Sequence, residues 1–225
     1  MGGHRARRVT QHRYGLLLLS AIVSLAIQGT VPPSPLQRIV VTALAGASVL
    51  LALRAADFAP RLGVLVGTIA VSVLALSVAR ETVGGIGEGA ALAMNAALVA
   101  VGPPAIAYGI IHDLRTSGRV QIEAVMGVLS LYILLGMLFA FTYGAIDRLG
   151  GDPFFAGGQD ATASQCLYFS FTTLTTVGFG DLVARADLGH TLAIFEALLG
   201  QIYLVTVVSL IVSNLGRPAR PDRQA

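Results

Sequence analysis

The chain has 225 residues, 55% of them hydrophobic and only 12% charged, with a mean hydropathy of +0.76. Ordinary soluble domains carry about 25% charged residues, so this composition excludes a typical water-soluble globule. The 15 basic residues, all arginine, face 12 acids and stand in short clusters between apolar runs. Such clusters are typical of a membrane topology signal and not of nucleic-acid binding. A single cysteine excludes an intrachain disulfide.

Apolar stretches follow one another along the chain, and a helix needs about 20 mostly apolar residues to cross the hydrocarbon core. We therefore expect an all-α membrane protein with six transmembrane helices, over residues 14–30, 39–53, 62–79, 90–111, 124–146 and 189–213. Pro103 and Pro104 interrupt the fourth stretch. The first stretch also has the basic flank of a secretory signal, but no convincing small-x-small cleavage site precedes Pro32.

The arginines also predict an orientation, because cytoplasmic loops collect them. With the N-terminus inside, eleven arginines lie on the cytoplasmic side and four on the other, namely Arg38, Arg80, Arg148 and Arg185. The count favours a multi-pass protein, in contact with membrane lipid, whose termini are both cytoplasmic. The long fifth connection, residues 147–188, then lies outside.

The fifth connection contains an apolar and aromatic stretch at residues 165–174, only half as long as a membrane span. Thr162 and Gln165 have the spacing of a capping box, which satisfies free N–H groups at a helix start. We therefore predict a re-entrant helix that begins after Thr162 and ends near Leu174.

The segment Thr176-Val177-Gly178-Phe179-Gly180 follows directly, with Asp181 next. Non-helical backbone at membrane depth is tolerated only when it is buried in protein or lines a water-filled path. We expect Gly178 and Gly180 to adopt backbone angles that are costly for other residues, so that successive carbonyls point the same way. Four such strands around an axis would form oxygen rings that replace the hydration shell of a cation.

This segment resembles the filter signature of the potassium channel family, T-V-G-Y/F-G followed by Asp. Residues 168–171 resemble the pore helix of small prokaryotic channels, and residues 195–205 their inner helix. The resemblance implies a homotetrameric, passive, potassium-selective channel of the inner membrane, of a six-segment type with a two-helix pore-loop module. It implies K⁺ as the permeant ion and no cofactor. The implied K⁺ ligands are the backbone carbonyls of Thr176, Val177, Gly178, Phe179 and Gly180, with the Thr176 hydroxyl.

Two residues depart from the usual pattern of that family. Thr172 stands where related channels often place a carboxylate, and Phe179 lacks the phenol of tyrosine. We therefore expect a filter that is held less firmly, with more inactivation or sodium leak. Glu196 is an acid inside a span and thus a functional candidate by default. The predicted supports of the filter are Thr172, Thr175, Asp181 and Glu196.

The last apolar stretch carries a mildly polar stripe that a water-filled cavity would wet. Gly200 lies where a bend would open this helix, although glycines in membrane helices also serve only for close packing. The residues of a possible gate are Gly200, Thr206, Ser209 and Ser213.

The predicted organisation has five parts: a cytoplasmic tail at 1–13, a four-helix module at 14–111, a cytoplasmic linker at 112–123, a pore domain at 124–213 and a cytoplasmic tail at 214–225. The fourth stretch contains no Arg or Lys, so we expect no steep voltage gating. We also expect no cytosolic ligand-binding domain in this chain.

Other readings remain open: a nonselective cation channel, a potassium-uptake transporter subunit, or a noncatalytic membrane scaffold. Uptake subunits of that kind resemble four linked pore-loop repeats, and this chain has one. No catalytic Ser/His/Asp set and no Walker loop occurs, so we expect no enzyme and no nucleic-acid partner.

Overall fold

The computed structural model describes residues 3–55, 60–83, 87–117, 122–158 and 161–215. This part of the chain forms α-helices and no named β-strand. The helices are α1 (Gly3–Thr30), α2 (Pro35–Ala55), α3 (Pro60–Val83), α4 (Glu88–Val99), α5 (Gly102–Ser117), α6 (Ile122–Gly150), α7 (Ala163–Leu174) and α8 (Asp187–Leu215).

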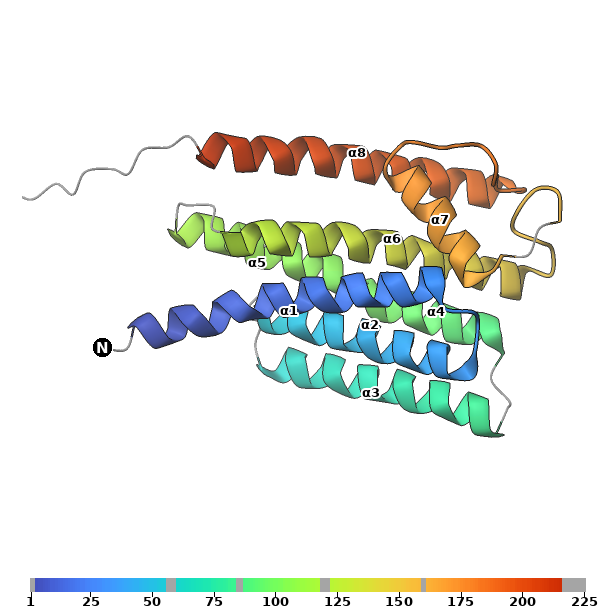
Figure 1. Ribbon diagram of the computed structural model, residues 1–225, viewed down its shortest axis with the longest axis horizontal. Coiled ribbons are helices and arrows are strands. Elements are labelled where there is room, and N and C mark those ends of the chain that lie inside the picture. The colour runs from blue at the N-terminus through green and yellow to red at the C-terminus, as the bar shows by residue number, and fades with distance from the viewer. Residues whose placement is uncertain (1–2, 56–59, 84–86, 118–121, 159–160, 216–225) are drawn as a thin grey trace, which may run out of the picture.

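The long helices lie roughly side by side along one axis of the molecule (Figure 1). α2 packs between α1 and α3, and α6 contacts α1, α4 and α5. The short helix α7 is inclined to the others and lies near one end of the bundle, where it contacts both α6 and α8 (Figure 1). The fold therefore holds α7 between two long helices.

The six predicted apolar stretches lie in helices, with a break at residues 100–101 of the fourth. Four helical spans in the described residues are long and apolar enough to cross a membrane: Pro35–Arg54, Glu88–Ile110, Val125–Gly150 and Asp187–Val207. Within the described side chains of α1 and α3, shorter apolar helical segments lie at Tyr14–Thr30 and Gly67–Leu76. The all-helical, multi-pass class is confirmed, whereas the count of six spans stays a prediction.

The predicted interruption of the fourth stretch is confirmed. α4 ends at Val99, and α5 begins at Gly102. Pro103 and Pro104 therefore fall in the first turn of α5, where a missing N–H breaks no helical hydrogen bond. The two short helices together form one of the four candidate spans.

The predicted ends of the chain fit the structure only in part. α1 begins at Gly3, so most of the predicted N-terminal tail is helical. Residues 118–121 of the predicted linker and 216–225 of the predicted C-terminal tail lie outside the described residues, as does the side chain of Ser213.

Buried aromatic rings anchor α7 to the rest of the bundle. Phe169 of α7 lies with its ring centroid 5.1 Å from Tyr143 of α6 and 5.4 Å from Phe155 of the loop before α7. Both contacts are edge-on, which is a favoured arrangement of aromatic pairs. This cluster fixes the position from which the Thr176–Gly180 segment departs.

Candidate functional site

Helix α7 starts as its sequence predicts. The Thr162 hydroxyl accepts a hydrogen bond from the Gln165 backbone N–H at 3.2 Å, and the Thr162 N–H donates to the Gln165 side chain at 3.1 Å. This reciprocal pair is a complete capping box. The predicted end at Leu174 is also confirmed.

The backbone after α7 folds back over the end of the helix. The N–H groups of Val177 and Gly178 both donate to the carbonyl of Thr172, at 2.9 and 3.0 Å, and the Thr176 N–H donates to the Thr173 carbonyl at 2.9 Å. Carbonyls in the last turn of a helix have no partner within it. The N–H groups of Thr176, Val177 and Gly178 thus bind the last turn of α7.

Left-handed backbone angles recur at every second residue of this segment. The φ angles are +60° at Thr176, +50° at Gly178 and +80° at Gly180. The prediction of unusual angles at the two glycines is confirmed. Thr176 is the one non-glycine residue with positive φ in the described chain, and a side chain in that region costs about 1–3 kcal/mol. Such strain persists only where the surrounding structure imposes it, which is typical of functional segments.

The structure connects Phe179 and Asp181 through Tyr168, a residue that the sequence did not single out as a support. The Tyr168 and Phe179 rings are stacked, with centroids 6.2 Å apart and planes 6° apart. Desolvation raises the pKa of the Tyr168 phenol, and so does its hydrogen bond to the Asp181 carboxylate. Tyr168 therefore holds both ends of the Phe179–Asp181 stretch from one side.

Two predicted supports, Thr172 and Thr175, bond within their own helix. The Thr172 hydroxyl donates to the Phe169 carbonyl at 3.0 Å, and the Thr175 hydroxyl donates to the Phe171 carbonyl at 2.6 Å. These bonds satisfy carbonyls near the helix end. Their contribution to the site is thus to stabilise the last turn of α7.

Glu196 of α8 lies fully buried behind α7. Its carboxyl oxygens lie 2.6 Å from the Tyr143 hydroxyl and 2.5 Å from the Ser170 hydroxyl. Ser170 also lies 2.7 Å from the carbonyl of Gly136 in α6. One side chain thus connects α6, α7 and α8. Sequence reasoning selected Glu196 but not Tyr143 or Ser170, because neither is near it in the chain.

Gly200 of α8 lies against the last residue of α7. A Cβ atom at Gly200 would stand 2.0 Å from the Leu174 carbonyl oxygen, and the same oxygen accepts a hydrogen bond from the Tyr132 hydroxyl at 3.1 Å. The close contact between α8 and the Leu174 carbonyl explains why position 200 is a glycine. Of the other predicted gate residues, Thr206 and Ser209 are exposed along α8.

Backbone hydrogen bonds join the two chain segments that flank α7 and the TVGFG segment. The Ala156 N–H donates to the Val183 carbonyl and the Arg185 N–H donates to the Phe154 carbonyl, both at 2.8 Å. The loop before α7 is therefore paired with the chain beyond Asp181.

The comparison with protein families matches the part of the chain that holds α6 to α8 and their connections. Residues 127–217 match the family model described as an ion channel. The chain is also 34% identical over 108 residues to the inward rectifier potassium channel Kirbac3.1 of Paramagnetospirillum magnetotacticum. This match covers 48% of the chain and 34% of that relative, so the chain matches about a third of the relative's length. The chain is thus similar to ion channels over residues 127–217 and to one potassium channel over 108 residues.

Proposed function

We propose that the chain is the subunit of a passive, potassium-selective channel in which four copies of Thr176–Gly180 form the filter. The observation that carries this proposal is the run of left-handed angles at residues 176, 178 and 180 directly after a half-length helix. Carbonyl rings from four such segments would replace the water around a K⁺ ion. The C-terminus of α7 would add partial negative charge below them.

The exposure of the filter segment in the single chain supports the assembly of four copies. Val177 is 54% exposed and Phe179 is 70% exposed. Helix α8 also exposes a row of large apolar side chains, namely Ile194, Phe195, Leu198, Ile202 and Val205. A tetramer would cover part of this surface, with membrane lipid around it. One chain supplies one filter strand, and a closed ring needs more.

The four apolar stretches before the pore domain carry no charged sensor in this proposal, and the fourth, residues 90–111 of α4 and α5, contains no Arg or Lys. Helix α4, which ends at Val99, contains no Arg or Lys. Steep voltage dependence needs several charges that move across the field, each worth about 2.3 kcal/mol per 100 mV. Conduction would therefore depend weakly on voltage. The arginine distribution supports an inner-membrane protein with both termini in the cytoplasm.

The test is potassium flux from liposomes that contain the full chain, repeated with sodium. Gly178→Ala places a side chain at φ +50° and should reduce potassium flux at least about tenfold, because an L-residue there is strained. The matched control is Gly29→Ala, since Gly29 also has open space around its added Cβ but no positive φ. Equal potassium and sodium flux would favour a nonselective channel, and an unaffected Gly178→Ala variant would overturn the filter assignment.

A further inference from the structure

Two long helices meet at the Leu174 carbonyl, which is the last carbonyl of α7. The Tyr132 hydroxyl of α6 donates to its oxygen at 3.1 Å. A Cβ atom at Gly200 of α8 would collide with the same oxygen, so the two helices both lie against it. Leu174 is fully buried. Water therefore does not reach this carbonyl, and its hydrogen bond comes from the protein.

Tyr132 supplies a hydrogen bond that α7 cannot supply by itself. Carbonyls in the last turn of a helix have no partner within it. The N–H groups of residues 176–178 bind two other carbonyls, those of Thr172 and Thr173. Within the described chain, the donor to the Leu174 oxygen is thus Tyr132. A buried acceptor without a donor is costly, so loss of this hydroxyl would favour a carbonyl that turns toward another donor.

The Leu174 carbonyl shares one rigid peptide plane with the Thr175 N–H. That N–H donates to the Phe171 carbonyl at 3.1 Å. The plane is therefore held at both edges, by α6 at its oxygen and by α7 at its N–H group. The next residue, Thr176, has a left-handed φ of +60° and begins the TVGFG segment. The orientation of this plane thus sets the direction in which the segment leaves α7.

A second tyrosine packs on the Tyr132 ring. The rings of Tyr132 and of Tyr203 in α8 are stacked, with centroids 5.4 Å apart and planes 23° apart. The Tyr203 hydroxyl donates to the Val128 carbonyl of α6. The two phenols therefore belong to one stack but hold different carbonyls, one at the end of α7 and one within α6.

We propose that Tyr132 is a positioning residue for potassium selectivity, whose hydroxyl fixes the Leu174–Thr175 peptide plane and thereby the inner end of the filter at Thr176. This inference rests on the proposed function. Selectivity depends on the number and arrangement of the carbonyls that coordinate the ion. Without the hydroxyl the plane is free to turn, so the innermost oxygen ring loses its fixed geometry and admits Na⁺ more readily.

The test compares Tyr132→Phe with Tyr203→Phe in the full chain in liposomes. Each variant loses one phenol hydroxyl and keeps its ring in the stack, so the two are matched in size and chemistry. The ratio of sodium to potassium flux should rise at least about threefold in Tyr132→Phe, because a buried acceptor loses its donor at the filter. In Tyr203→Phe the ratio should stay within about 1.5-fold of the parent, because the lost bond lies within α6.

Hydrogen–deuterium exchange provides a readout that does not depend on conduction. Peptides that cover residues 171–178 should exchange at least about threefold faster in Tyr132→Phe than in Tyr203→Phe. The reason is that the N–H groups of Thr175 and Thr176 leave their acceptors when the peptide plane turns. Mass spectrometry of the protein in liposomes measures both rates.

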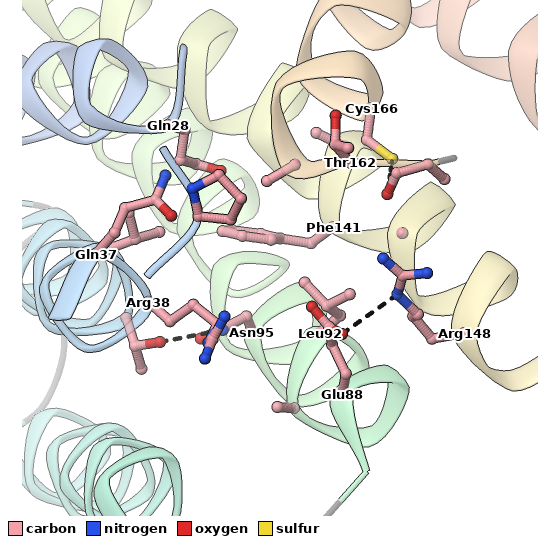
Figure 2. Close-up of a pocket in the computed structure, with 18 residues that line it drawn as sticks. Gln28, Gln37, Arg38, Glu88, Leu92, Asn95, Phe141, Arg148, Thr162 and Cys166 are labelled. Atoms are coloured by element: carbon pink, nitrogen blue, oxygen red, sulfur yellow. Dashed lines mark hydrogen bonds and ion pairs between the residues drawn. The ribbon is translucent and has the colours of Figure 1, made fainter. Parts of the chain in front are cut away.

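A third variant separates positioning from a general loss of stability. Asn95 of α4 donates to the Thr42 hydroxyl of α2 at 3.1 Å, and Figure 2 shows this bond as a dashed line at Asn95. Helix α7 contacts α1, α6 and α8, so Thr42→Val removes a bond between two other helices. This variant should unfold at a lower temperature, because Asn95 loses its partner. Its sodium-to-potassium flux ratio and its exchange at residues 171–178 should match the parent.

Three outcomes would overturn the proposal. The first is an equal flux ratio in Tyr132→Phe and Tyr203→Phe, and the second is a Thr42→Val ratio that rises as far as that of Tyr132→Phe. The third is a raised ratio in Tyr132→Phe without faster exchange at residues 171–178. A parent chain that passes no potassium, or passes sodium equally well, would instead defeat the proposed function, and the exchange rates would still test whether Tyr132 holds the end of α7.

Discussion

The hydroxyl of Ser170 lies 2.5 Å from Oε1 of Glu196 and 2.7 Å from the carbonyl oxygen of Gly136. A serine hydroxyl carries one hydrogen and can donate to only one of these oxygens. Both contacts are satisfied when Glu196 carries a proton and donates it to Ser170, while Ser170 donates to Gly136. In this arrangement Glu196 is a neutral group that joins three helices.

The first prediction tests this count of hydrogens. Glu196→Gln keeps a donor for Ser170 and an acceptor for Tyr143, so potassium flux should stay within about threefold of the parent. Glu196→Ala leaves a cavity and a Tyr143 hydroxyl without its partner, which should reduce the free energy of unfolding by about 2–4 kcal/mol. Flux assays and thermal unfolding measure both effects. Equal losses of potassium flux and stability in Glu196→Gln and Glu196→Ala would mean that an ionised carboxylate is required.

The second prediction concerns Gly200. An added Cβ would collide with the Leu174 carbonyl, so Gly200→Ala should move α8 away from α7 and reduce stability by about 1–3 kcal/mol. Gly46→Ala is the control, because its Cβ would meet only ordinary contacts at 3.4 Å. A Gly200→Ala protein with parent-like stability but altered opening would instead favour the hinge.

The third prediction separates the two contacts of Tyr168. Tyr168→Phe keeps a ring that stacks on Phe179 but loses the hydrogen bond to Asp181, whereas Tyr168→Leu loses both. If these contacts hold the filter, the ratio of sodium to potassium permeability should rise about threefold in the Tyr168→Phe variant and further in Tyr168→Leu. Each contact contributes about 1 kcal/mol.

Bi-ionic flux measurements give the ratio of sodium to potassium permeability. The Phe179→Tyr variant changes the other ring of the same stacked pair. An unchanged sodium-to-potassium ratio in all three variants would show that Tyr168 and Phe179 do not limit selectivity.

The fourth prediction concerns the reactivity of Cys166. Burial raises the pKa of its thiol to about 12, and the nearby Asp147 charge acts in the same direction. The thiolate is the reactive form, so at pH 8 the alkylation rate should be about a thousandfold below that of an exposed cysteine. The rate should also keep rising with pH up to 12, because the fraction of thiolate grows throughout that range.

N-Ethylmaleimide labelling followed by mass spectrometry measures these rates, since the chain has a single cysteine. The reference is Ser164→Cys in a Cys166→Ser chain, because Ser164 is exposed on the same helix. Equal rates at the two positions would contradict the buried environment of Cys166.

Local features of the structure were predictable from the sequence. The bounds of α7 follow from the capping box at Thr162 and from the TVGFG segment that stops the helix after Leu174. The break between α4 and α5 follows from Pro103 and Pro104. Each of these signals acts over a few residues, so no knowledge of the rest of the fold is needed.

Contacts across the fold were not predictable in the same way. Tyr143 is 53 residues from Glu196, and Ser170 is 26 residues away, so no spacing rule joins them. The positive φ of Thr176 was missed because threonine disfavours it, and only the hydrogen bonds to the end of α7 impose it.

The two backbone hydrogen bonds between Phe154–Ala156 and Val183–Arg185 close the chain around α7 and the TVGFG segment into a loop. The far end of that segment is therefore tethered within its own subunit. In the proposed tetramer, a wider pore entrance would require each subunit to tilt as a unit or to break these two hydrogen bonds. We therefore expect the proposed entrance to resist stretching even where neighbouring subunits move apart.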